Sequence, residues 1–125
     1  MKKAIRLVLV LAILLCAALP VNATSYWIVD DAGLLTEDEI TVLDAFAARL
    51  VNDYGMDVVI LTVESLEGKS SEAFADDYFD DNGYGYGENA SGVLLLLSME
   101  YRDWAISTSG DCIRIFSDRQ LDNIF

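Results

Sequence analysis

The sequence of 125 residues contains no histidine. Histidine is the commonest general base in enzymes and the commonest side-chain ligand of transition metals. Its absence therefore excludes zinc centres and catalytic triads that depend on histidine. The length also bounds the architecture, because a chain of this size forms one domain around a single core.

Cysteine and basic side chains are scarce as well. The two cysteines are Cys16 and Cys112, and Cys16 lies in an N-terminal segment that we expect to be removed. A single remaining cysteine forms no internal disulfide, so the fold depends on its apolar core. Eight lysine and arginine residues stand against 21 acidic residues, and the net charge is −13. This charge repels nucleic acid and anionic lipid, so we expect no nucleic-acid partner.

The first 23 residues have the order of a secretory signal peptide. Lysine and arginine at positions 2, 3 and 6 precede an apolar stretch over residues 7–19, and Val21-Asn22-Ala23 ends in the small residue that signal cleavage requires. We therefore expect residues 1–23 to be removed and the mature chain to be exported, to the cell envelope or the exterior. Thirteen apolar residues are too few to span a bilayer comfortably, which predicts a mature chain without a transmembrane segment.

Lipid attachment at Cys16 is an alternative fate for the same N-terminus. It normally needs a small residue directly before the cysteine, and Leu15 occupies that position. We therefore favour cleavage after Ala23. The removed segment holds three of the eight basic residues and none of the 21 acidic ones, so the mature net charge is five minus 21, or −16.

Helical and strand patterns alternate along the rest of the chain. Thr36-Glu37-Asp38-Glu39 fits a capping box, apolar residues follow at helical spacing, and Gly55 stops the helix. The run VVILTV over residues 58–63 has the length and composition of a strand that is buried on both faces. The other expected elements are an extended segment at 26–29, a second helix from Ser71 to Asn82-Gly83, and two strands at 93–99 and 104–108 joined by a tight turn.

This order of elements predicts an α/β fold. Helices between strands make the central strands parallel, whereas the last two strands form an antiparallel hairpin. We therefore expect a compact α/β sandwich over residues 24–125, with a mixed, mostly parallel sheet flanked by helices.

The C-terminal residues resemble the start of another helix. Ser117 and Gln120 fit its first turn, and its apolar face begins with Leu121, Ile124 and Phe125. A helix of barely two turns is unstable by itself. We therefore expect the domain to be truncated in its C-terminal part.

Acidic residues and glycines gather before the apolar run of residues 93–99, in FDDNGYGYGENASG. Carboxylates, an amide and flexible backbone carbonyls are the hard oxygen ligands that calcium prefers. The spacing is not that of an EF-hand, because the twelfth position counted from Asp80 is Ser91 instead of a bidentate acid. Calcium binding and a simple acidic helix end with a glycine turn are both compatible with this stretch.

A second acidic pair, Asp30-Asp31, follows the extended segment. Adjacent carboxylates in a turn either reach one ion together or cap the turn. The pair lacks the spacing of aspartyl phosphatases, whose two acids stand two residues apart, since Ala32 occupies that position. A cysteine phosphatase needs an arginine six positions after its cysteine, and that position after Cys112 is Asp118. We expect Cys112 to be a small, partly buried filler.

The ordered set of motifs resembles the TPM domain family. The stretches VDDAGLLTEDEI, GMDVVILTVESLEG, FADDYFDDNGYG and SGVLLLLSMEYRDWAI, with the helix start Ser117-Asp118, occur in the family's order over residues 26–125. Members of the family are exported bacterial envelope proteins and thylakoid-lumen proteins linked to photosystem II repair. Some of them bind calcium, and some are reported as acid phosphatases.

The resemblance implies a mixed sheet with flanking helices and a cation-binding cleft of acids at one end of it. The glycine-rich loop forms one side of the implied cleft, and calcium is the implied ion. The chain departs from many relatives at Asn89-Ala90-Ser91-Gly92, where they have an Asn-Gly turn. The metal ligands implied by family position are Asp30, Asp80, Asp81, Asn89 and Asp118. We add Asp31 as a candidate ligand because it directly follows Asp30.

Two classes of function fit these residues. The first is an exported, non-catalytic module that binds calcium and meets an envelope or membrane protein partner. The second is a metal-dependent, acid phosphatase-like hydrolase, in which the same carboxylates hold a metal that polarises a phosphate ester. A phosphatase also needs positive charge to offset its substrate, and Arg102 and Arg114 are the only plausible nearby cations. We therefore favour the binding module.

Overall fold

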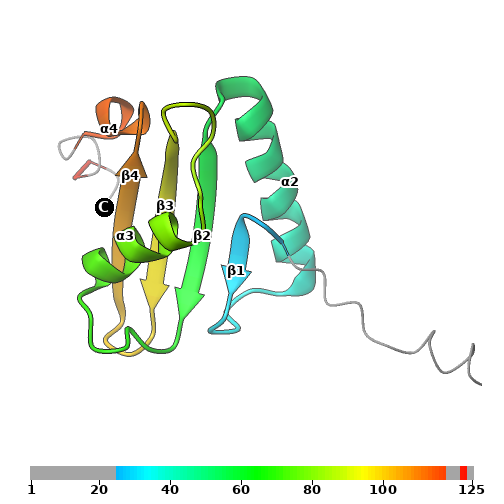
Figure 1. Cartoon of the computed structure of the whole chain (residues 1–125). Coiled ribbons are helices and arrows are strands. Elements are labelled where there is room, and N and C mark those ends of the chain that lie inside the picture. Colours follow the sequence, from blue (N-terminus) through cyan, green and yellow to red (C-terminus); the bar gives the residue numbers. More distant parts are fainter. Residues whose placement is uncertain (1–24, 118–121, 124–125) are drawn as a thin grey trace, which may run out of the picture.

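The computed structural model describes residues 25–117 and 122–123 (Figure 1). The predicted signal peptide over residues 1–23, and residues 118–121 and 124–125 near the C-terminus, lie outside the described residues. The described elements are, in chain order, β1 (Ile28–Asp30), α2 (Glu37–Tyr54), β2 (Asp57–Val63), α3 (Ser71–Asp81), β3 (Gly92–Ser98), β4 (Asp103–Ser109) and α4 (Cys112–Ile115).

The four strands form one sheet in which spatial order follows chain order, β1-β2-β3-β4. β1 pairs with β2 and β2 pairs with β3 in parallel, and β3 pairs with β4 in an antiparallel hairpin. The predicted mixed, mostly parallel sheet with a hairpin is therefore confirmed. Parallel pairing places the carboxyl ends of β1, β2 and β3 at one edge of the sheet and their amino ends at the other.

The two ends of α2 follow the local signals in the sequence. The Thr36 hydroxyl accepts a hydrogen bond from the backbone N–H of Glu39, and the Glu39 carboxylate accepts one from the N–H of Thr36. Gly55 ends the helix with φ at +63°, a left-handed conformation that glycine adopts without strain. The predicted capping box and the glycine stop are both confirmed.

The main core lies between the sheet and α3. α3 crosses in front of the sheet in Figure 1 and packs on β3 and β4. Phe79 of α3 is 2% exposed and belongs to this core. Alternate residues of the three long strands point to this core: Val59, Leu61, Val63, Leu94, Leu96 and Ala105. Val63 is 6% exposed, and the others are at most 3% exposed.

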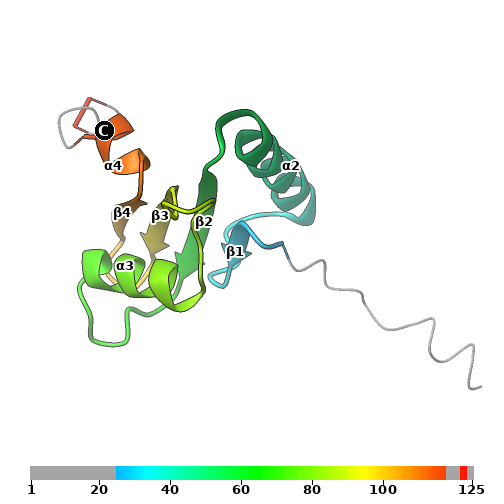
Figure 2. The same ribbon diagram turned by 45° about the horizontal axis from the view of Figure 1, so that its top comes forward.

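The opposite face of the sheet is covered less completely. Figures 1 and 2 together place α2 on that face, where it packs on β1 and β2. Ile28 of β1 and Ala47 of α2 are buried there, but Val58 and Ile60 of β2 are half-buried. The prediction that residues 58–63 are buried on both faces is wrong for Val58 and Ile60, because within the described residues α2 covers their side of β2 only in part.

Candidate functional site

Asp30 ends β1 at the carboxyl edge of the sheet, and the protein's own donors occupy its carboxylate. The backbone N–H groups of Leu34 and Leu35 donate to it at 2.9 and 2.8 Å, and the Thr62 hydroxyl donates to it from β2. Three donors on two oxygens fasten the turn after β1 to the sheet. The Asp30-Asp31 pair was interpreted either as an ion site or as a turn cap, and Asp30 caps the turn.

The hydrogen bonds to Asp30 make stability depend on pH. Burial raises the pKa of Asp30, but the bonds from Thr62, Leu35 and Leu34 outweigh it, so the pKa lies below its ordinary value of 3.8. The charged form therefore stabilises the fold above pH 3.8, and this contribution is lost as the pH falls below 3.8 toward the folded-state pKa. We expect Asp30→Asn to lower the free energy of unfolding by about 1 to 2 kcal/mol at neutral pH and to approach the parent in strong acid.

Thermal melting followed by circular dichroism, from neutral pH down to about pH 2.5, measures this convergence. The matched control is Asp53→Asn, which removes an exposed carboxylate from α2 and should melt like the parent at neutral pH. A gap in melting temperature between Asp30→Asn and the parent that stays constant at every pH would contradict the assignment.

Asp31, Asp80 and Asp81 are exposed, and no group within the described residues donates a hydrogen bond to their carboxylates. Asp31 lies in the turn after β1, and burial and then the Asp31 charge raise the pKa of the Tyr78 phenol on α3. Asp81 follows Tyr78 by three residues, which is about one helical turn. The fold therefore brings the turn after β1 beside the C-terminal half of α3, with exposed carboxylates on both.

Asn89 lies at the amino edge of the sheet, opposite to Asp30 and Asp31. It precedes β3, whose first residue pairs with the first residue of β2, whereas Asp30 pairs close to the end of β2. A strand rises about 3.3 Å per residue, so roughly 15 Å of strand separates these two levels. The structure does not bring Asn89 together with the acids after β1. Asp118, the last predicted ligand, lies outside the described residues.

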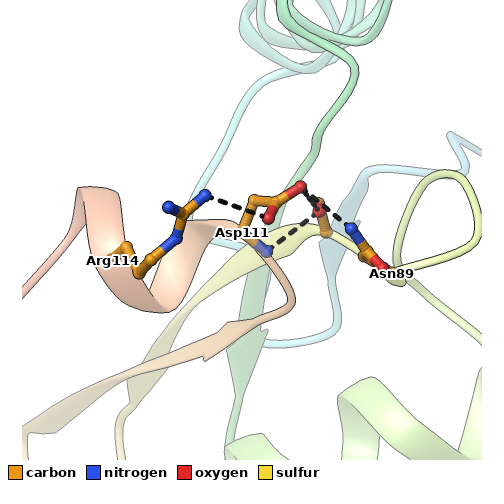
Figure 3. A network of polar contacts seen from close by, with 4 residues as sticks. Asn89, Asp111 and Arg114 are labelled. Atoms are coloured by element: carbon orange, nitrogen blue, oxygen red, sulfur yellow. Dashed lines mark hydrogen bonds and ion pairs between the residues drawn. The ribbon is translucent and has the colours of Figure 1, made fainter.

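The Asn89 side chain belongs to a polar network between the loop at 82–91 and α4 (Figure 3). The Asn89 amide and the Arg114 guanidinium each donate to the Asp111 carboxylate at 3.3 Å, and the Asp111 N–H donates to the Ser91 hydroxyl at 3.1 Å. The hydrogen bond from Asn89, assisted by the Arg114 charge, holds the pKa of Asp111 below its ordinary value. This network ties the glycine-rich loop to the end of β4.

Sequence reasoning missed Asp57, a carboxylate that is only 5% exposed at the start of β2. It accepts hydrogen bonds from the indole N–H of Trp27 at 3.0 Å and from the backbone N–H of Gly85 at 2.8 Å. Its own N–H donates to the carbonyl of Ser91 at 3.1 Å. Asp57 therefore fixes the glycine-rich loop against β1 and β2. The available signal was an acid placed directly before the apolar run VVILTV.

Comparison with known families shows the family to which the chain belongs. The sequence model of the TPM domain matches residues 28–125, which is most of the chain. The chain belongs to the TPM domain family. None of the curated proteins matches this TPM domain.

The fold of this TPM domain is similar to a structure solved by NMR in solution, the N-terminal domain of a protein from P. gingivalis. The TM-score is 0.70, the sequence identity is 21%, and the similarity covers 82% of this chain. It covers 66% of the P. gingivalis domain, so the chain spans about two thirds of that domain's length. At this identity the likeness shows a shared fold and nothing about activity.

Calcium takes roughly six to eight oxygen ligands, so a site made by the protein alone needs several oxygen ligands that converge. No group of three or more cysteine, aspartate or glutamate side chains converges within the part of the chain that the structure describes. Asp30 already accepts three hydrogen bonds, whereas Asp31, Asp80 and Asp81 are exposed. These residues do not form a closed protein cage for calcium.

Two further ionisable side chains, Cys112 and Tyr84, are buried and have raised pKa values. Cys112 is completely buried, and burial together with the nearby Asp111 charge raises the pKa of its thiol. Burial and neighbouring rings raise the pKa of Tyr84 to about 12, and its hydroxyl donates to the carbonyl of Tyr26 at 3.0 Å. In residues 25–117 and 122–123, no helix is both long and apolar enough to cross a membrane.

Proposed function

We propose that this TPM domain is an exported, non-catalytic module that binds calcium at the turn after β1 and the C-terminal end of α3. The observation that carries the proposal is the exposure of carboxylates in the turn after β1 and at the end of α3, to which no described residue donates a hydrogen bond. Asp31 and Asp81 supply the carboxylate oxygens, and water completes the coordination. A bound ion offsets the repulsion between these carboxylates and joins the turn to the helix.

The ionisable groups support binding over catalysis. A general acid or base works best when its pKa lies near the working pH. The pKa values of Asp30, Asp103 and Asp111 lie below their ordinary value instead, and that of Tyr84 is about 12. A phosphate ester at this edge would meet several carboxylates, while Lys69 is engaged by Asp77 at 2.6 Å. The phosphatase alternative therefore gains no support from the described groups.

A calcium titration of the purified chain tests the proposal. Calcium-binding modules outside the cell have dissociation constants of about 10⁻⁴ to 10⁻³ M, and we expect a value in this range by calorimetry. At about thirty times the dissociation constant, calcium should stabilise the fold by about 2 kcal/mol in a thermal melt. Asp31→Asn and Asp81→Asn should each weaken binding about tenfold, because each removes a charged ligand of a site that has few.

The matched control is Asp53→Asn, which changes the net charge equally but alters α2 instead of the proposed site. At ordinary ionic strength, Asp53→Asn should bind calcium with the same affinity as the parent. A folded parent chain that does not bind calcium refutes the proposal. Equal calcium binding by the parent, Asp31→Asn and Asp81→Asn also refutes it, because the ion would then be held by diffuse surface charge.

A further inference from the structure

Asn82 and Gly83 form the junction between α3 and the glycine-rich loop that leads to β3 (Figure 1). Asn82 is the only asparagine in the sequence that a glycine follows, whereas aspartate follows Asn52 and alanine follows Asn89. Asparagine is chemically labile, because its side-chain amide reacts with the backbone nitrogen of the next residue. Glycine has no side chain to hinder that nitrogen. The sequence therefore singles out this junction for a reaction that the proposed calcium site does not use.

The reaction is a deamidation, and it needs no enzyme or cofactor. The Gly83 nitrogen loses its proton to solvent base and attacks the side-chain carbonyl carbon Cγ of Asn82. A bond from Cγ to this nitrogen forms, the bond from Cγ to Nδ2 breaks, and Nδ2 takes up a proton and leaves as ammonia. Water then opens the succinimide ring at either of its carbonyl carbons. The product is aspartate or isoaspartate at position 82, which adds one negative charge.

The surroundings of the junction leave room for this ring. Asn82 and Gly83 are both exposed. Gly83 has φ at +67°, and a Cβ built on it would meet no atom within 4 Å. Gly85 differs, since a Cβ there would lie 2.6 Å from the carbonyl oxygen of Ala90. Solvent base and the water that opens the ring therefore reach the junction directly.

Two hydrogen bonds restrain the reacting groups. The Asn82 side-chain amide donates to the Tyr78 carbonyl at 2.8 Å, and the Gly83 N–H donates to the Asp80 carbonyl at 3.1 Å. Asn82 has ψ at 1°, so the peptide bond after it must rotate before the Gly83 nitrogen faces Cγ. Both acceptors belong to the last turn of α3. Ring closure therefore requires this turn to open.

The opening is local. Helix ends have few hydrogen bonds to break and open at a low free energy. Opening here breaks one further bond, from the Tyr84 N–H to the Phe79 carbonyl. The Tyr84 hydroxyl still donates to the Tyr26 carbonyl, and the Gly85 N–H still donates to Asp57. These contacts hold the loop while the last turn of α3 opens, so the reaction proceeds from the folded chain.

We propose that Asn82-Gly83 is a site of spontaneous deamidation in the folded chain, and that the modification loosens the end of α3. The product lacks the amide that donates to the Tyr78 carbonyl. Its new carboxylate directly follows Asp80 and Asp81 at a helix C-terminus, where negative charge is unfavourable. The inference does not depend on calcium, and its tests are made without the ion. Its outcome is therefore separate from that of the calcium proposal.

Incubation of the purified, folded chain in calcium-free, mildly alkaline buffer tests the site. We expect peptide mass spectrometry to show conversion at Asn82, while Asn52 and Asn89 in the same sample remain amides. The rate should increase with pH, because the attack requires the deprotonated Gly83 nitrogen. Urea at concentrations well below the unfolding transition should change the rate little, since the opening is local.

Gly83→Ala is the variant that tests the attacking nitrogen. A Cβ at this position meets no atom, so the variant should fold despite the strain of φ at +67°. Its methyl group hinders the nitrogen, so conversion of Asn82 should slow at least about tenfold, which corresponds to about 1.4 kcal/mol of activation free energy. The matched control is Gly87→Ala, with φ at +74° in the same loop, and it should deamidate like the parent.

Asn82→Asp carries the charge of the product and isolates its effect on stability. We expect it to melt at a lower temperature than the parent, followed by circular dichroism. Asn52→Asp adds the same charge in the last turn of α2. It should lower the melting temperature less, because the Tyr78 carbonyl keeps its donor.

The proposal is overturned if the folded parent keeps the amide at Asn82 while the urea-unfolded chain loses it, since the fold would then protect the site. Conversion of Gly83→Ala at the rate of the parent also overturns it, as does a rate that increases with urea in proportion to the unfolded fraction. A melting temperature of Asn82→Asp no lower than that of Asn52→Asp would show that the modification does not loosen α3.

Discussion

Replacing Asp57 with alanine is expected to lower the free energy of unfolding by about 3 kcal/mol. The substitution removes a carboxylate that is 5% exposed and leaves the Trp27 indole N–H and the Gly85 N–H without their acceptor. An unsatisfied buried donor is destabilising by about 1 to 3 kcal/mol, and bonds to a charged acceptor lie in the upper part of this range. For a domain of this size the change corresponds to a decrease of roughly 15 °C in melting temperature.

Urea unfolding monitored by circular dichroism measures the effect of Asp57→Ala. Asp57→Asn keeps one acceptor oxygen and should destabilise the fold by about half as much. Asp53→Ala is the control. It removes an exposed acid that, like Asp57, lies close to Gly55 in the sequence, and it should change the free energy of unfolding by less than about 0.5 kcal/mol. Equal stability of Asp57→Ala and Asp53→Ala would show that the buried carboxylate does not hold the loop.

Replacing Gly85 with alanine is the second large expected effect, at about 3 kcal/mol or more. Gly85 has φ at +109°, a conformation that residues with a side chain rarely adopt. A Cβ at this position would also lie 2.6 Å from the carbonyl oxygen of Ala90 and 2.7 Å from its carbonyl carbon. These are backbone atoms of the same loop, so relief requires the loop to move away from Asp57 and to lose the bond from the Gly85 N–H.

Gly87→Ala separates backbone strain from collision. Gly87 has φ at +74°, yet a Cβ there would meet no atom within 4 Å. We expect Gly87→Ala to destabilise the fold by about 1 kcal/mol, through strain alone. Denaturant midpoints of the two variants give the comparison. If Gly87→Ala is as damaging as Gly85→Ala, the close approach of Gly85 to Ala90 does not determine the conformation of the loop.

The elements that the sequence predicts well are those specified by neighbouring residues. The capping box at Thr36 and Glu39 joins groups three residues apart, and Gly55 acts on the helix that immediately precedes it. The hairpin of β3 and β4 likewise depends on one tight turn. Such signals need no knowledge of the rest of the fold, which explains why the strand and helix order and the fold class follow from the sequence.

The role of Asp57 depends on residues far along the chain. Trp27 and Gly85 lie 30 and 28 residues away from it, on either side. No local pattern encodes these partners, so an acid at the start of a strand looks like ordinary solvated surface. Asp30 was ambiguous for a related reason, because the Thr62 hydroxyl that helps to settle its role is 32 residues distant.

The grouping of the acids was predicted from family position, and the topology divides it. Asp30 ends a parallel strand and Asp31 follows it, whereas Asn89 precedes a parallel strand, so these positions lie at opposite edges of the sheet. The partial exposure of Val58 and Ile60 could not be predicted from the sequence either. An apolar run indicates a buried strand, but it does not show how much of each face of the strand a helix covers.

The coincidence of strand order and chain order has a consequence for folding kinetics. Among the four strands of the described residues, each pairs with the strand before it, and none inserts between two that are already paired. The longest closures during sheet assembly are the crossovers that contain α2 and α3, and the last closure is a short hairpin turn. The contact order is accordingly modest for a sheet protein, and the domain should assemble strand by strand, faster than folds whose sheets pair distant parts of the chain.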